Sequence, residues 1–410
     1  MAASVRAPLL TRHFALVWVL TFLTFFAAFQ LFPTVPLRLR ELGASLAESG
    51  RFMTAFTTGS ALGALVTGPL GDRVGQRRMI LWCAFGFAAF MGAYGLVSNR
   101  LWFYAFAVPH GIVWSGLLTA TMATLGGILP SDRRADGLSL YGLASPGGAM
   151  LGPVVGVALY TSVGFGAITL ANGVIFTALG FLAVSLPPDP PRSAPAPAWR
   201  APEWVMLAPC LILFFSALGY GALGSYTVQE AVDLGFGWVH LSSLGKVSLA
   251  STFLSLMAFG MIAVRVVMGF VGFGRQPVAL LPWMLLAATA GLGLLALLPG
   301  GLTRHALSAV LYGGGYSMMH TLVTTYVLHV IPPDRRGTAF GATLFSFDIG
   351  IGLGNLLLGL AIGSWGYRWG WALATLTHAV TLPLAFHLVR RDALHRASER
   401  SPHEAAPHAP

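Results

Sequence analysis

The chain has 410 residues, of which 56% are hydrophobic and only 9% are charged, and its mean hydropathy is +0.73. This balance excludes an ordinary soluble domain and is typical of an all-α protein that crosses the membrane many times. The net charge of +10 does not indicate nucleic-acid binding, because the basic residues are spread over short loops instead of forming one patch. Cys83 and Cys210 lie inside apolar runs, so we expect neither a disulfide nor a metal site from them.

Twelve apolar segments follow one another with short connections. A membrane-spanning helix needs about 20 mostly apolar residues, and each segment is of that order. The first is too long for the core of a signal peptide, so we interpret it as the first span. Within it, Gln30 adds a polar group among several phenylalanines. The predicted spans are 14–36, 50–70, 79–97, 101–128, 137–160, 165–186, 204–227, 246–270, 278–298, 304–330, 337–361 and 366–389.

A dense charged run, which glycines interrupt, joins the second and third spans. Charges so closely spaced must lie outside the hydrocarbon, so the run predicts a tight loop whose glycines permit a sharp turn. Taken by itself, the run is compatible with a basic loop that only sets the topology. The run reads Gly68, Pro69, Leu70, Gly71, Asp72, Arg73, Val74, Gly75, Gln76, Arg77, Arg78.

Two histidines occupy matching spans, the fourth and the tenth. His110 has Trp114 one turn away, and His320 has Tyr316 one turn away. Imidazole titrates near neutral pH, so each histidine is a candidate for passing protons or binding substrate. The alternative for each is a hydrogen-bonded residue of the helix core.

The fifth span carries a glycine stripe. Gly148, Gly152 and Gly156 are four residues apart, so they form one smooth face that another helix can approach closely. Pro153 removes a backbone hydrogen bond within the same stretch. The stripe alone is compatible with plain helix packing.

Asp348 is the one acidic residue near the middle of a predicted span. A carboxylate costs several kcal/mol at the membrane midplane, and residues of this kind are usually functional. Helical spacing places it on one face with Asn355 and several glycines, a face that we expect to point toward protein or a cavity. Asp348 is therefore a candidate proton, cation or amine site, and the alternative is a structural carboxylate held by neighbouring hydroxyls or amides.

A short internal sequence repeat predicts two halves of six helices each. Pro130-Ser131-Asp132-Arg133-Arg134 recurs as Pro333-Asp334-Arg335-Arg336, after the fourth span of each half. Seventeen of the 24 basic residues lie on the side of the Gly68–Arg78 run, which places both termini in the cytoplasm. We expect a cytoplasmic N-terminus (1–13), a first bundle (14–186), a proline-rich linker (187–203), a second bundle (204–389) and a disordered tail (390–410).

Residues 14–389 resemble twelve-helix transporters of the major facilitator superfamily, in the branch that exports drugs or sugars in exchange for protons. Gly68–Arg78 matches the family's G-x-L-x-D-R-x-G-R-[KR] loop, and Gly148–Gly156 matches its G-x-x-x-G-P-x-x-G efflux motif. The resemblance implies that Asp72 pairs across the two halves in a cytoplasmic gate. Many proton-coupled members also carry an Arg in the fourth helix, where this chain has Ala107, so proton coupling would have to use Asp348 or a histidine.

The resemblance implies a monomeric secondary transporter of the cytoplasmic (inner) membrane that exports a small organic molecule by alternating access in exchange for protons. The same sequence leaves open an uptake symporter or uniporter for a sugar or carboxylate. A membrane-embedded enzyme that uses His110, His320 and Asp348 is a remote alternative, since the chain lacks nucleophile–base spacing. We expect no cofactor, no metal and no nucleic-acid partner.

Overall fold

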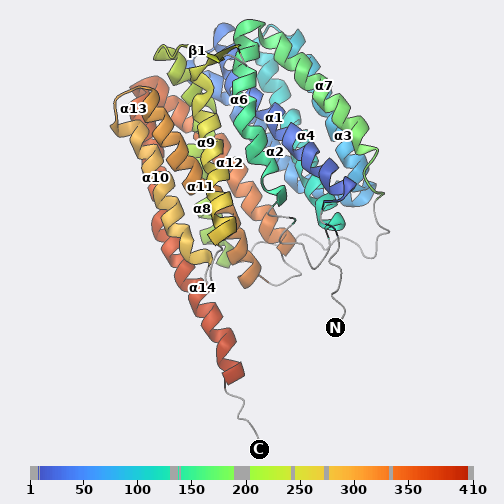
Figure 1. The fold of residues 1–410 in the computed structure, drawn as a ribbon, viewed down its shortest axis with the longest axis vertical. Coiled ribbons are helices and arrows are strands. Elements are labelled where there is room, and N and C mark those ends of the chain that lie inside the picture. Colours follow the sequence, from blue (N-terminus) through green and yellow to red (C-terminus); the bar gives the residue numbers. More distant parts are fainter. Residues whose placement is uncertain are drawn as a thin grey trace, which may run out of the picture.

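A computed structural model describes residue 8, residues 10–129, residue 137, and residues 140–188, 204–241, 245–271, 277–331 and 336–404. These residues form long helices that lie side by side (Figure 1). The helices are α1 (Arg12–Glu41), α2 (Leu46–Val74), α3 (Gln76–Leu96), α4 (Arg100–Ile128), α6 (Ala144–Ser162), α7 (Phe165–Ala183), α8 (Leu207–Asp233), α9 (Thr252–Val271), α10 (Leu281–Leu297), α11 (Leu302–Val330), α12 (Arg336–Trp365), α13 (Tyr367–Ala379) and α14 (Thr381–Glu404), with short 3₁₀ turns η2 (Trp204–Met206), η3 (Leu249–Ser251) and η4 (Pro277–Leu280).

The helices correspond one to one to the predicted spans, with α13 and α14 together forming the last. Nine segments in the described part of the chain are long and apolar enough to cross a membrane by length and composition. Pro383 explains the break between α13 and α14, because proline is tolerated in the first turn of a helix but not within it. The predicted all-α membrane fold is confirmed.

Helix packing repeats between the two halves of the chain. In each half the first helix packs on the fifth (α1 on α6, α8 on α12), and the second packs on the fourth (α2 on α4, α9 on α11). The third packs on the sixth in the same way (α3 on α7, α10 on α13). Buried apolar residues form one large cluster within 14–186 and another within 206–388, which Val157 of α6 joins. The result is a pair of six-helix bundles that lie next to each other in Figure 1.

The two ends of the bundle pair differ. One end, here called the hairpin end, holds an antiparallel pair of short strands, β1 (Trp238–Leu241) and β2 (Gly245–Ser248). The other, here called the terminal end, holds the start of α1 and the end of α14 (Figure 1). The strands were not predicted, and the helix expected from residue 246 begins at Thr252.

The C-terminal tail also differs from the prediction. The sequence predicts disorder from residue 390, whereas α14 continues to Glu404. This stretch contains the good helix formers Ala, Leu, Arg and Glu. In addition, Arg396 Nε donates to Asp392 Oδ2 at 2.8 Å, an i,i+4 pair that supports the helix.

Candidate functional site

The two bundles meet along two crossed helix pairs. The second helix of each bundle packs on the fifth helix of the other, so that α2 lies on α12 and α9 lies on α6. Small residues allow the close approach of α2 and α12, since a Cβ on Gly352 would lie 2.5 Å from Thr57 Oγ1. Thr54 Oγ1 also donates to the Gly352 carbonyl at 2.7 Å. We call these contacts between the bundles the seam. A side chain on the seam can contact both bundles.

Asp348 lies on this seam. Its side chain is only 7% exposed, and its Oδ2 accepts a hydrogen bond from Ser60 Oγ of α2 at 2.8 Å. A hydrogen bond to an ionised carboxylate stabilises more than one to a neutral acid. The Ser60–Asp348 contact thus makes the packing of one bundle on the other depend on the charge of a buried carboxyl group.

Further contacts close the hairpin end between the bundles. Arg40 Nη1 of α1 lies 3.2 Å from Asp233 Oδ1 of α8, and Gln229 Nε2 donates to Ser49 Oγ at 3.4 Å. Four hydrogen bonds between the bundles, those of Arg40, Thr54, Ser60 and Gln229, lie from Asp348 toward the hairpin end. These hydrogen bonds and the Arg40–Asp233 ion pair hold the two bundles together at the hairpin end.

A small cavity lies between the bundles, in the same region of α12 as Asp348. It is almost entirely apolar and aromatic, a composition suited to a small organic ligand. Its walls come from α1, α2, α8, α9 and α12. The lining residues are Phe29, Phe32, Met53, Tyr220, Gly221, Gly224, Leu254, Met257 and Ile351.

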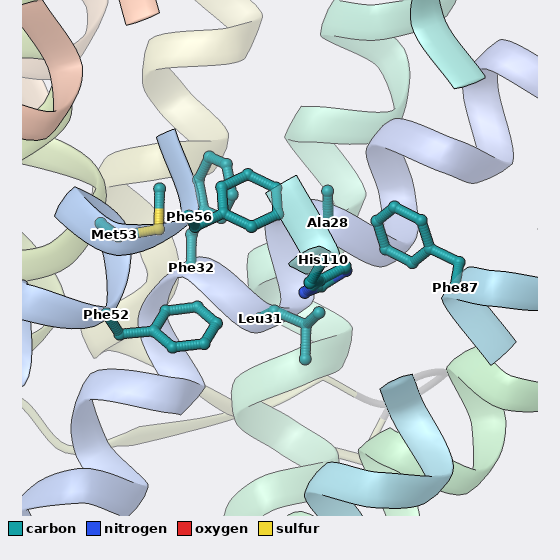
Figure 2. Close-up of a pocket in the computed structure, with 8 residues that line it drawn as sticks. All are labelled: Ala28, Leu31, Phe32, Phe52, Met53, Phe56, Phe87 and His110. Atoms are coloured by element: carbon teal, nitrogen blue, oxygen red, sulfur yellow. The ribbon is translucent and has the colours of Figure 1, made fainter. Parts of the chain in front are cut away.

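His110 and Trp114 lie within the first bundle, not in this cavity. Figure 2 shows His110 between Phe87 and Phe56 at the edge of a second small void. The His110 ring meets Phe87 with 4.2 Å between centroids, its Nδ1 lies 3.3 Å from Tyr94 Oη, and its Nε2 has no partner among the described residues. Trp114 lies edge-on to Phe25 nearby. Phe32 and Met53 line both voids. His110 and Trp114, which the sequence predicts as site residues, are therefore separated from the central cavity by these side chains.

Tyr316 and His320 lie near the central cavity within the second bundle. Tyr316 stacks on Tyr220 with 4.8 Å between ring centroids, and Tyr220 lines the cavity. One turn further along α11, the side chain of His320 is exposed and lies edge-on to Phe347 of α12. The structure therefore brings Tyr316, His320 and Asp348 to the same region and leaves His110 apart from it.

Asn355 and Gln30 are engaged in packing. Ser225 Oγ donates to Asn355 Oδ1, and Asn355 Nδ2 donates to the Ile351 carbonyl at 3.0 Å, so the amide joins α8 to α12 inside one bundle. The Cα and Cβ of Gln30 lie against Gly156 of α6, and its side chain is 1% exposed. Within the described chain no group of three or more His, Cys, Asp or Glu could hold a metal ion.

Comparison with known proteins agrees with this architecture. The model of the Major Facilitator Superfamily matches residues 17–355 and, in a second overlapping match, 306–409. The chain belongs to the major facilitator superfamily. It is accordingly a membrane transporter and not an enzyme.

Full-length relatives of this superfamily member are distant. It is 23% identical over 398 residues to the "Staphylopine export protein" of Staphylococcus aureus, covering 91% of this chain and 95% of the relative. It is 25% identical over 385 residues to the "Gallate transporter" of Pseudomonas putida, covering 86% and 83%. Among solved structures, a bacterial homologue of the human lysosomal transporter Spinster, in an inward-facing and unoccupied conformation, shares the fold with a TM-score of 0.73 at 16% identity, over 95% of this chain and 99% of that one.

The superfamily's efflux motif in α6 packs against α1. A Cβ on Gly148 would lie 2.4 Å from the Phe22 carbonyl, and one on Gly152 would lie 2.6 Å from the Phe26 carbonyl. Gly156 meets Gln30 in the same way, and Pro153 is buried within the helix. The glycines are thus required for the contact of α6 with α1, while a role of the motif in antiport stays a prediction.

The superfamily's gate motif is more helical than the sequence predicts. α2 runs through Val74 and α3 starts at Gln76, so Gly75 alone makes the turn, with a φ of +101° that favours glycine. Arg73 and Arg78 are exposed, and Arg77 is half-buried. Gly68 and Asp72 lie on the α2 backbone, but their surroundings are outside the described part of the structure. The gate contact of Asp72 stays a prediction.

One buried charge cluster, around Glu230 and Arg304, has no counterpart among the residues that the sequence singles out. Glu230 and Arg304 form a buried ion pair between α8 and α11. Trp371 Nε1 donates to Glu230 Oε2 at 2.9 Å, and Arg304 Nη1 donates to the Leu295 carbonyl at 2.9 Å. Because all these partners lie in the second bundle, the cluster holds that bundle together and is not part of the cavity.

Proposed function

We propose that this protein exports a small organic molecule by alternating access, in exchange for protons, and that Asp348 carries the proton. The observation behind this proposal is the hydrogen bond between Ser60 and Asp348, which joins the two bundles through the only buried carboxylate described on their seam. The similarity to a staphylopine export protein supports the export direction.

Proton binding and bundle opening are linked through this contact. A hydrogen bond to a charged group contributes about 1.5–3 kcal/mol, against about 0.5–1.5 kcal/mol for a neutral pair. Protonation of Asp348 therefore weakens the Ser60–Asp348 contact by about 1 kcal/mol. The hairpin end therefore opens more readily when Asp348 is protonated, and its closure is favoured once Asp348 has released the proton.

The orientation follows from charge. We propose that the terminal end, which carries Arg12, Arg73, Arg77 and Arg78, faces the cytoplasm, because basic residues are retained on that side of the inner membrane. The closed hairpin end would then face outward. In this orientation the structure corresponds to a carrier whose outer side is sealed, and a monomer contains the complete pathway.

The test measures transport in inverted membrane vesicles that contain the protein. A panel of amphipathic cations, anions and neutral compounds is added to vesicles with a preformed pH gradient, and proton movement is followed with a pH-sensitive dye. Export by antiport predicts that a transported compound discharges the gradient in vesicles with the protein and not in empty vesicles. Asp348→Asn should abolish this discharge while substrate–substrate exchange without a gradient persists.

Two results would change the proposal. Uptake that is unaffected when the pH gradient is collapsed would remove proton antiport. Accumulation of the compound by intact cells that express the protein would favour the alternative, an uptake symporter or uniporter. The similarity to a gallate transporter keeps this alternative open.

A further inference from the structure

Arg265 of α9 is a positive charge inside the second bundle that the proposed mechanism does not use. Its Nη2 donates to the carbonyl of Ser317 at 2.9 Å. Ser317 lies close to the middle of the 29-residue helix α11, so the guanidinium group is held near the middle of the bundle. A long basic side chain near a helix end would ordinarily reach outward to the headgroups. Here it reaches inward instead.

The face of α9 that carries Arg265 is the one that meets the other bundle. Ala258, seven residues earlier, packs with Phe29 of α1 and Ala149 of α6, and Leu254, eleven residues earlier, lines the central cavity. Residues seven and eleven apart lie on one side of a helix. Arg265 therefore leaves α9 toward the space between the bundles, on the terminal side of the cavity residues of α9.

Arg265 and His320 lie together there. The Ser317 carbonyl that holds Arg265 is one turn from His320 on α11, and the two side chains are close enough to interact electrostatically. Within the described chain, Arg265 has no carboxylate at ion-pair distance, and its Nε has no hydrogen-bond partner. An arginine keeps its charge even when buried. Arg265 is half-buried, and a charge in a membrane interior without an anionic partner is costly, so a ligand carboxylate would supply the missing anion.

We infer that the transported molecule is an amphipathic organic anion whose carboxylate binds between Arg265 and His320. The planar guanidinium group suits a carboxylate, and a histidine ring offers an N–H donor in either protonation state. The aromatic rings of Tyr220, Tyr316 and Phe347 beside this pair would contact an apolar body. This inference rests on the proposed function, because it assigns the chemistry of the substrate to the space between the bundles.

The test compares three probes of one shape on the purified full-length protein: 2-naphthoate, the neutral 2-naphthamide and the cationic 2-naphthylmethylamine. Binding is followed by tryptophan fluorescence and by thermal stabilisation, neither of which needs a gradient. We expect naphthoate to bind at least about tenfold more tightly than naphthamide. Arg265→Gln should remove this preference while leaving naphthamide affinity within about twofold.

Controls separate recognition from folding. Arg368→Gln changes an exposed arginine of the same bundle and should leave all affinities unchanged. Should Arg265→Gln fail to fold, Arg265→Lys decides the matter, because it keeps the charge but loses the planar group and should show an intermediate preference. No binding of naphthoate, equal binding of naphthoate and naphthamide, or a preference unchanged in Arg265→Gln and Arg265→Lys would overturn the inference. Selective naphthoate binding without proton-coupled transport would instead refute the proposed function alone.

Discussion

Removal of the Ser60 hydroxyl is expected to release the hairpin end. In Ser60→Ala the 2.8 Å hydrogen bond to Asp348 is lost, while the backbone packing of α2 on α12 stays intact. With an ionised carboxylate the bond contributes about 1.5–3 kcal/mol, so its loss shifts the closed–open equilibrium by about 10- to 150-fold. With a protonated carboxyl it resembles a neutral hydrogen bond between membrane helices, about 0.6 kcal/mol, and the shift falls to about threefold.

The shift can be measured as a distance between spin labels by electron–electron resonance. Labels at Leu96→Cys and Leu298→Cys, both exposed at the hairpin end of different bundles, are placed in a chain whose Cys83 and Cys210 have been replaced. Ser60→Ala should increase the long-distance population at neutral pH and do so far less in acid. The matched control Thr58→Ala removes only a bond within α2 and should leave the distribution unchanged. An unchanged distribution in Ser60→Ala, or an equal shift in the control, would refute the reasoning.

Three further variants test other parts of the account. Glu230→Gln leaves the buried Arg304 charge unpaired and should cost about 3–5 kcal/mol of stability, seen as a lower unfolding temperature; an unchanged temperature would contradict the structural role of the pair. Gly148→Val forces a side chain into the backbone of α1 and should lower the unfolding temperature sharply, whereas Gly147→Ala, whose Cβ meets only a ring at 3.4 Å, should not; equal effects would argue against the close contact. Asp72→Asn should slow turnover more than it weakens substrate binding, and wild-type turnover would exclude the gate.

The fold was largely accessible from the sequence, because a membrane permits few solutions. Long apolar runs must become helices that satisfy their own backbone hydrogen bonds, and Asp348 stood out because carboxylates are rare within such runs. The repeat of the Pro–Asp–Arg–Arg motif predicted two halves. Short-range features were harder to predict: strands β1 and β2 and the helical continuation of α14 depend on local pairing that hydropathy does not report.

Sequence patterns placed single residues on helices but could not say which helices meet. Helical spacing put Asn355 on the face of Asp348, yet its amide is engaged by Ser225 on α8. Histidines in matching spans suggested equal roles, whereas His110 is enclosed by aromatic rings and His320 is exposed. Nothing in the sequence signals the inward position of Arg265, because the carbonyl that accepts its hydrogen bond lies 52 positions away along the chain.

Proton antiport through Asp348 can be measured as substrate-driven proton movement in liposomes that contain only the purified protein. We expect that a substrate gradient drives protons in the opposite direction across the membrane, and that Asp348→Asn abolishes this flux while the protein still binds and exchanges substrate. Substrate transport at the wild-type rate with no proton movement, or an undiminished proton flux in Asp348→Asn, would contradict this expectation.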